Sequence, residues 1–178
     1  MARLFAKTMG ILMACLFVGL GSPALNCQSM AADTIKIGQL DPISGPFEVT
    51  GRVYYAGIKF AVDEQNKKGG LLGKKIEILQ EDSELKPDVA NRKAKKLILE
   101  NKVNFLGSGT GTHISVALNK LATSYKTLFI NYGALSEICQ GKEFSRYAFR
   151  VCHNNYSITS ALVQFMATKP YRKYYIIC

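Results

Sequence analysis

Hydrophobic and polar positions follow two different periods along the chain. In six short segments, apolar residues alternate with polar ones or form a continuous run, which is typical of β-strands. Between most of these segments, apolar residues recur every three or four positions, which predicts helices. The predicted strands are residues 35–40, 74–82, 103–109, 127–133, 146–152 and 173–178.

Four predicted helices each have one apolar face. The first begins at Arg52 and ends at "KKGG", and the second begins near Pro87 and ends at Asn101. The third and fourth span residues 112–125 and 157–168. Strands and helices that alternate in this way predict the α/β class, with a doubly wound, mostly parallel sheet and helices on both faces. The side chains expected to face the core are Tyr54, Ile58, Ala61, Ala90, Ala94, Leu97, Ile98, Ile114, Ala117, Leu118, Leu121, Ile158, Ala161, Leu162 and Phe165.

The N-terminal residues have the three-part layout of a secretory signal. Arg3 and Lys7 precede an uncharged apolar run at residues 9–21, and small residues follow it. A membrane anchor is the alternative, but the run is short for a membrane span. A lipid anchor at Cys27 is a further alternative, although "ALNC" matches such a cleavage site poorly. We therefore predict a signal peptide at residues 1–32, a periplasmic or secreted protein, and no stable membrane insertion after cleavage.

The net charge of +10 raises the question of a nucleic-acid partner. The basic residues lie around a Gly-rich turn, as Lys67, Lys68, Lys74 and Lys75 do, or on a helix beside an apolar stripe. We expect these residues to form solvated faces. Because export also removes most nucleic-acid partners, we predict no nucleic-acid binding.

Two cysteines of the predicted mature chain lie in loop-like segments. Cys139 and Cys152 either form a disulfide across a loop or remain two free thiols. The spacing of Cys152, His153 and His113 matches no zinc pattern, so we expect no metal site.

The strand predicted at residues 173–178 is apolar enough for the interior of a sheet, yet the sequence stops there. We expect the sequence to be an N-terminal fragment of a longer protein. The alternative is that this strand completes a small domain.

A Gly/Thr-rich turn, "GSGTGT", joins a predicted strand to a predicted helix. Ligands of parallel sheets lie beyond the carboxyl ends of the strands, where such loops meet helix N-termini. Gly107, Gly109 and Gly111 let a ligand approach the backbone, and Thr110 and Thr112 supply hydroxyls. The free N–H groups of the helix suit a carboxylate or a phosphate.

The motifs of nucleotide binding and hydrolysis are missing from the sequence. A P-loop needs a Lys after its last Gly, where Thr112 and His113 stand, and a dinucleotide fingerprint would follow the first strand. The sequence has no G-x-S-x-G elbow. We therefore expect no catalytic residues and no cofactor. A tight turn that binds nothing remains the structural alternative.

Several segments resemble the N-terminal part of type I periplasmic solute-binding proteins, and more closely the Leu/Ile/Val-binding family of ABC importers. They are "IKIGQLDPISGPF", "DEQNKKGGLLGKKIEI", "KPDVANRKAKKLI", "NFLGSGTGTHISVAL", "LFINYGAL" and "RYAFRVC". The resemblance implies two lobes that close on a ligand, with residues 33–153 as lobe one and residues 154–178 as the start of lobe two.

The resemblance also implies where a small amino acid or amide would bind. A further implied partner is the membrane permease of an importer. Leu135 departs from a pattern that often has a hydroxyl there, which puts one contact to an amino group in doubt. Asn131 is expected to hydrogen-bond locally. The alternatives are a ligand sensor of the same fold and an exported α/β enzyme. The implied ligand-binding residues are Thr50, Gly51, Gly109, Thr110, Gly111, Thr112, Gly133, Ala134 and Leu135.

Overall fold

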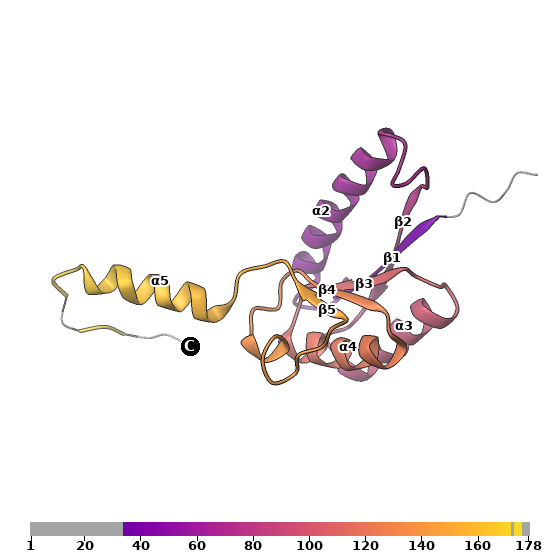
Figure 1. The fold of residues 1–178 in the computed structure, drawn as a ribbon. Coiled ribbons are helices and arrows are strands. Elements are labelled where there is room, and N and C mark those ends of the chain that lie inside the picture. The colour runs from indigo at the N-terminus through magenta and orange to yellow at the C-terminus, as the bar shows by residue number, and fades with distance from the viewer. Residues whose placement is uncertain (1–33, 172, 176–178) are drawn as a thin grey trace, which may run out of the picture. The chain divides into compact units, whose positions relative to one another are not determined.

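The chain folds around a five-stranded parallel sheet with the strand order β2-β1-β3-β4-β5 (Figure 1). The structure, a computed structural model, describes residues 34–171 and 173–175. All four strand pairs are parallel, which confirms the predicted α/β class. The strands are β1 (Ile35–Asp41), β2 (Ile76–Asp82), β3 (Phe105–Ser108), β4 (Leu128–Asn131) and β5 (Ala148–Arg150).

The helices follow the predicted order, but the first begins earlier than predicted. Helix α2 begins at Glu48. The residues that disfavour a helix, Pro42, Gly45 and Pro46, all come before this position. Glu48 lies in the first turn, where its charge suits the helix N-terminus, and it pairs with Arg52 one turn later. The helical segments are α2 (Glu48–Lys67), α3 (Pro87–Leu99), α4 (Thr112–Tyr125), the 3-10 turn η1 (Glu137–Cys139) and α5 (Asn155–Ala167).

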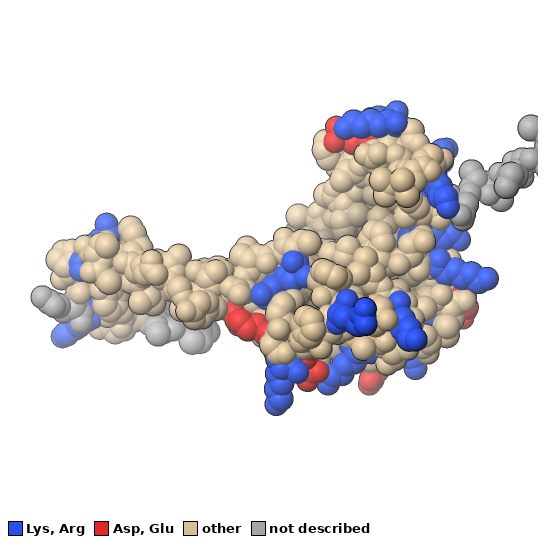
Figure 2. Space-filling view, in the orientation of Figure 1, with Lys and Arg blue, Asp and Glu red and all other residues tan. Residues whose placement is uncertain are grey.

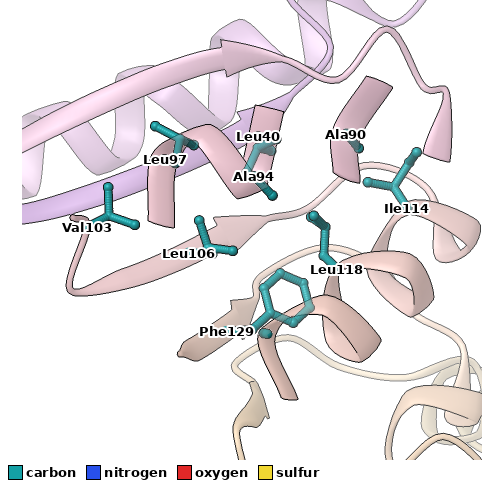
Figure 3. Packing of buried hydrophobic residues seen from close by; sticks show 10 residues of the cluster. Leu40, Ala90, Ala94, Leu97, Val103, Leu106, Ile114, Leu118 and Phe129 are labelled. Carbon is teal, nitrogen blue, oxygen red and sulfur yellow. The ribbon is translucent and has the colours of Figure 1, made fainter. Parts of the chain in front are cut away.

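The hydrophobic core lies between the sheet and helices α3 and α4 (Figure 3). Leu40, Leu106 and Phe129 point from three neighbouring strands towards Ile114 and Leu118 of α4, and all five are at most 1% exposed. Burial of such side chains contributes about 1.5–3 kcal/mol each. This face therefore holds most of the apolar packing that stabilises the fold.

The buried face of α4 is wider than the predicted stripe. Ile114 and Leu118 are buried as predicted, whereas Ala117 and Leu121 are only half-buried. Asn119 is buried because the segment before β5 packs on this side of the helix, and its amide donates to the carbonyl of Glu143. In α3, Ala90, Ala94 and Leu97 are buried as predicted, and Ile98 is partly buried.

The other face of the sheet is only partly covered. Helix α2 crosses this face, and only Gly51 and Val62 of the helix are buried. Beside α2 lies an apolar hollow of about 390 Å³ over the middle of the sheet. Ile37, Phe105 and Ile130 line its floor.

Helix α5 does not bury the face that its sequence predicted. Ile158, Leu162 and Phe165 are 44%, 57% and 56% exposed. The prediction was wrong because no described element covers this helix; its first turn is held by backbone bonds to Leu135 and the carboxylate of Glu137. Residues 173–175 form no strand, and the rest of the predicted sixth strand lies outside the described residues.

Cys139 and Cys152, for which the sequence left a disulfide and two free thiols open, are free thiols in the structure. Cys139 is buried in η1, and the Cys152 thiol faces the carbonyl of Ala134. Burial raises the pKa of both thiols. The predicted signal peptide lies outside the described residues, in which no helix is long and apolar enough to cross a membrane.

Candidate functional site

The loops that leave β1, β3 and β4 meet at the carboxyl edge of the sheet. Because the strands are parallel, their ends lie side by side, and the N–H of Tyr132 donates to Ser108 across the ends of β3 and β4. The structure thus brings together the two predicted loops, residues 109–112 and residues 133–135. This edge is where parallel sheets hold their ligands.

A buried carboxylate occupies the centre of this edge. Asp41, the last residue of β1, is fully buried, and one of its oxygens accepts from the N–H groups of Gly109 (2.9 Å) and Thr110 (3.0 Å). Its other oxygen accepts from the Gln39 amide (3.1 Å) and the Tyr132 hydroxyl. Two N–H groups that the sequence assigned to a ligand are therefore used inside the protein.

Two glycines of the Gly/Thr turn lie under aromatic rings. Tyr132 lies across β3, and a Cβ at Gly107 or Gly109 would stand 2.8 or 2.6 Å from this ring. Tyr54 of α2 packs edge-on against Tyr132, with ring centroids 5.1 Å apart. Burial, followed by the charge of Asp41, raises the pKa of both tyrosines, and that of Tyr132 far more. Gly107 and Gly109 thus make room for tyrosine rings, and their part in binding a ligand stays a prediction.

The turn after β4 is closed by Asn131, as predicted. Its side-chain oxygen accepts from the N–H groups of Gly133 (3.1 Å) and Ala134 (2.8 Å), and its amide donates to the Ala134 carbonyl (2.8 Å). The N–H groups of Gly133 and Ala134 are consequently also engaged. Leu135, the third residue predicted in this turn, is half-buried, and its carbonyl accepts from Arg150 (3.3 Å).

The start of α4 keeps groups that a ligand can use. Gly111 precedes the helix with a φ of 87°, and no side chain caps the first turn. The first N–H groups of a helix have no partner within the helix, so those of Thr112, His113 and Ile114 are available to an acceptor, whereas the N–H of Ser115 donates to Gly111. The hydroxyl of Thr110 is buried, and it has no partner among the described residues. This combination of donors fits an anionic group of a ligand.

Thr50 and Gly51 lie in the first turns of α2, whereas the sequence placed them in a loop over the ligand. Gly51 is needed for the packing of this helix, because a Cβ there would stand 1.8 Å from the Pro42 carbonyl oxygen. Thr50 is half-buried beside it. The prediction was wrong about the loop because the acidic first turn allows the helix to begin before the glycine.

Two residues of the site were missed by the sequence analysis, Asp41 and Tyr54. Asp41 precedes a proline in a segment rich in turn residues, so it was counted with the loop. An acidic residue at the end of an apolar strand was the signal that could have identified it, because such a group needs buried donors. Tyr54 was assigned only to the apolar face of its helix.

Comparisons with protein families, with single proteins and with solved structures all find binding proteins. A family model described as "Periplasmic binding protein" matches residues 34–177. The Leu/Ile/Val-binding protein homolog 4 of Brucella abortus is 26% identical over 131 residues, which are 70% of this chain and 31% of that protein.

Solved structures of solute-binding proteins share the fold. One is a solute-binding protein of an ABC transporter from Rhodopseudomonas palustris in complex with 3,4-dihydroxybenzoic acid (TM-score 0.62, 32% identity, covering 68% of this chain and 32% of that one). Another is the branched-chain amino acid transporter substrate-binding protein of Streptococcus pneumoniae in complex with isoleucine (TM-score 0.63, 26% identity, 68% and 34%). The chain spans about a third of the length of these proteins.

Proposed function

The chain belongs to the periplasmic binding protein family, and from this premise we propose that it forms the ligand-binding first lobe of a solute-binding protein of an ABC importer. It binds its ligand without chemical change, outside the cytoplasm. Residues 33–153 form this lobe, and residues 154–178 begin the second lobe.

One observation carries the proposal. The uncapped start of α4 lies next to the buried, unpartnered hydroxyl of Thr110, at the edge where three loops meet. Free N–H groups and a hydroxyl are donors, and donors at a helix N-terminus suit a carboxylate. The Asp41 carboxylate cannot serve as an exposed partner for an ammonium group, because it is fully buried and accepts four hydrogen bonds.

The ligand we propose is a small molecule with a carboxylate, such as an amino acid. The two solved relatives hold isoleucine and 3,4-dihydroxybenzoic acid, and a carboxyl group is the feature that these molecules share. The ligand carboxylate is held by the Thr112 N–H and the hydroxyls of Thr110 and Thr112. Gly109, Gly133 and Ala134 shape the loops, since their N–H groups are engaged inside the protein.

The lobe alone binds weakly. Hydrogen bonds to a charged group contribute roughly 1.5–3 kcal/mol each, and three of them at the lower end of this range correspond to a dissociation constant of about millimolar. Closure of a second lobe would exclude water and add contacts, and the closed form would dock on the permease.

An NMR titration tests the site. Isoleucine or benzoate at millimolar concentration should shift the backbone amide resonances of Gly111, Thr112 and His113. The resonances of Gly133 and Ala134 should move much less, because their N–H groups stay on Asn131. Each of the variants Thr110→Val and Thr112→Val should weaken binding by about tenfold or more, since a carboxylate oxygen loses a donor.

Ser124→Val is the matched control, because this hydroxyl lies on the same helix, is exposed and bonds to Lys120. Shifts that cluster outside the start of α4, or unchanged affinity in both threonine variants, would show that the turn is structural and that the ligand binds elsewhere.

A further inference from the structure

Basic residues line the edge of the sheet opposite the candidate site. We call this edge, formed by the beginnings of the five parallel strands, the strand-start edge. The strand beginnings are joined across it by backbone bonds of 2.8 Å from Ile35 to Lys75, from Asn104 to Lys36 and from Phe129 to Tyr147. Each strand carries a cation at its beginning or within three residues before it: Lys36, Lys75, Lys102, Lys126 and Arg146.

The charge of this edge is reinforced by the end of α2. Lys67 and Lys68 end this helix, and Lys74 follows in the turn to β2. Figure 2 shows blue side chains at the end of α2 and beside the start of β1. Four acidic residues accompany them: Asp63 and Glu64 near the end of α2, where Asp63 pairs with Lys59, Glu77 near the start of β2, and Glu100 after α3.

Most of these cations are not used within the protein. In the part of the chain that the structure describes, no ion pair involves Lys67, Lys68, Lys75, Lys102 or Lys126. Lys36 donates from its ammonium to the carbonyl of Asn101 at 3.3 Å, and the Arg146 guanidinium lies over the Tyr147 ring, 5.8 Å from its centroid. These lysines are therefore available to an anionic partner.

Two of the lysines stand where the backbone disfavours them. Lys102 and Lys126 have φ values of 54° and 53°, in the left-handed region that glycine or asparagine adopts more readily after a helix. A favourable interaction of a helix C-terminus with a cation offsets part of this cost. The sequence nevertheless has a lysine at both positions, where glycine would adopt the same φ at a lower steric cost.

We propose that the strand-start edge docks on a membrane surface that contains anionic phospholipid headgroups. Lysines dominate the edge, and their ammonium groups are mobile point charges that suit a fluid layer of headgroups better than a fixed bidentate partner. The surface is separate from the candidate ligand site.

Vesicle flotation of the full chain tests the proposal. Vesicles of phosphatidylcholine alone report any binding by the apolar N-terminal run, and addition of phosphatidylglycerol reports the charge-dependent part. This second part should fall steeply with added salt. The double variant Lys102→Gly/Lys126→Gly should weaken it by about tenfold or more, because each lysine near an anionic surface contributes to the attraction.

The control variant Lys86→Gln/Lys142→Gln loses the same charge away from the edge and should bind nearly as well as the wild type. Thermal unfolding of both variants separates binding from stability: the glycine variant should unfold at the same or a higher temperature. Equal losses in the two variants would reduce the effect to net charge and overturn the proposal. Binding to a soluble polyanion such as heparin, with no preference for phosphatidylglycerol vesicles, would overturn the choice of a membrane as partner.

Discussion

The two faces of the sheet are held by different physical means. On the face of α3 and α4, apolar side chains such as Leu106 and Phe129 are packed to near-complete burial. On the face of α2, Phe105 and Ile130 line an open hollow. At the carboxyl end of the strands, the loops are held in place by hydrogen bonds to Asp41. One face supplies apolar packing, and the other supplies a polar network that shapes the candidate site.

This difference separates stability from function within one small sheet. Residues that pair in register lie on the same face of the sheet, and the next residue of each strand lies on the other face, because successive side chains alternate between faces. Leu106 pairs with Phe129 on the packed side, and Phe105 pairs with Leu128 on the other. Substitutions of the same kind on the two sides should therefore have different consequences.

The largest expected effect is that of Phe129→Ala. The side chain is 1% exposed in the core, so its loss should lower the free energy of unfolding by about 3–5 kcal/mol, measured by urea denaturation. Phe105→Ala is the matched control, because this ring is only half-buried beside the hollow, and it should cost about 1 kcal/mol. Equal losses would mean that the α2 face carries as much packing energy as the other, and the comparison would fail.

The next prediction concerns the polar network. Asp41→Ala should lower the free energy of unfolding by about 3 kcal/mol, because it leaves the buried donors of Gly109, Thr110 and Tyr132 without an acceptor. Asp82 pairs with Asp41 in the strand register and also ends its strand, but it is only partly buried. Asp82→Ala should cost about 1 kcal/mol, since water can replace its bonds.

The amide resonances of Gly109 and Thr110 provide a second readout in the Asp41→Ala variant. They should broaden or shift strongly if the carboxylate holds the turn. If they stay in place and the free energy of unfolding is unchanged, the order of the α2 face has another source.

The smallest effect concerns Glu81 of β2, whose ion pairs join this strand to α3. Glu81 accepts from Lys96 at 2.9 Å, with Lys93 at 3.5 Å, and these contacts lower the pKa of the Glu81 carboxyl from its usual 4.5. A lowered pKa stabilises the folded state above the pKa of the unfolded chain, and this contribution is lost as the pH falls through the folded pKa. Partly exposed pairs of this kind contribute about 0.2–1 kcal/mol.

Glu81→Gln should therefore reduce the free energy of unfolding at neutral pH by about this amount, and the difference from the wild type should disappear in acid. Urea denaturation at several pH values measures it. A difference that persists unchanged below the folded pKa would show that the carboxylate charge does not contribute.

Much of the fold could be predicted because its signals are local. The helix at residues 112–125 was predicted to the residue, since apolar spacing begins after a glycine and ends before a polar turn. The buried alanines of α3 followed from their spacing alone. Helix α5 shows the limit, because an apolar stripe predicts a buried face only when another element is present to cover it.

The candidate site was harder to predict because its contacts join distant residues. The sequence located the Gly/Thr turn at the carboxyl edge, but the use of its N–H groups depends on Asp41, which lies 68 residues before Gly109. The role of Gly107 depends on a ring from the next strand, that of Tyr132. Pattern and propensity contain no information on such pairings, whereas Asn131 was predicted correctly because its partners are two and three residues away.

The crossing of Tyr132 over β3 constrains how this chain can evolve. While the ring stays in place, a side chain larger than hydrogen cannot be accommodated at Gly107 or Gly109 without a shift of the ring. Loss of the ring would remove this barrier at Gly107, whereas a Cβ at Gly109 would still stand 2.7 Å from the Tyr54 ring. It would also remove the hydroxyl that reaches Asp41. In descendants of this sequence, substitutions at these positions should therefore be correlated. The positions are Asp41, Gly107, Gly109 and Tyr132.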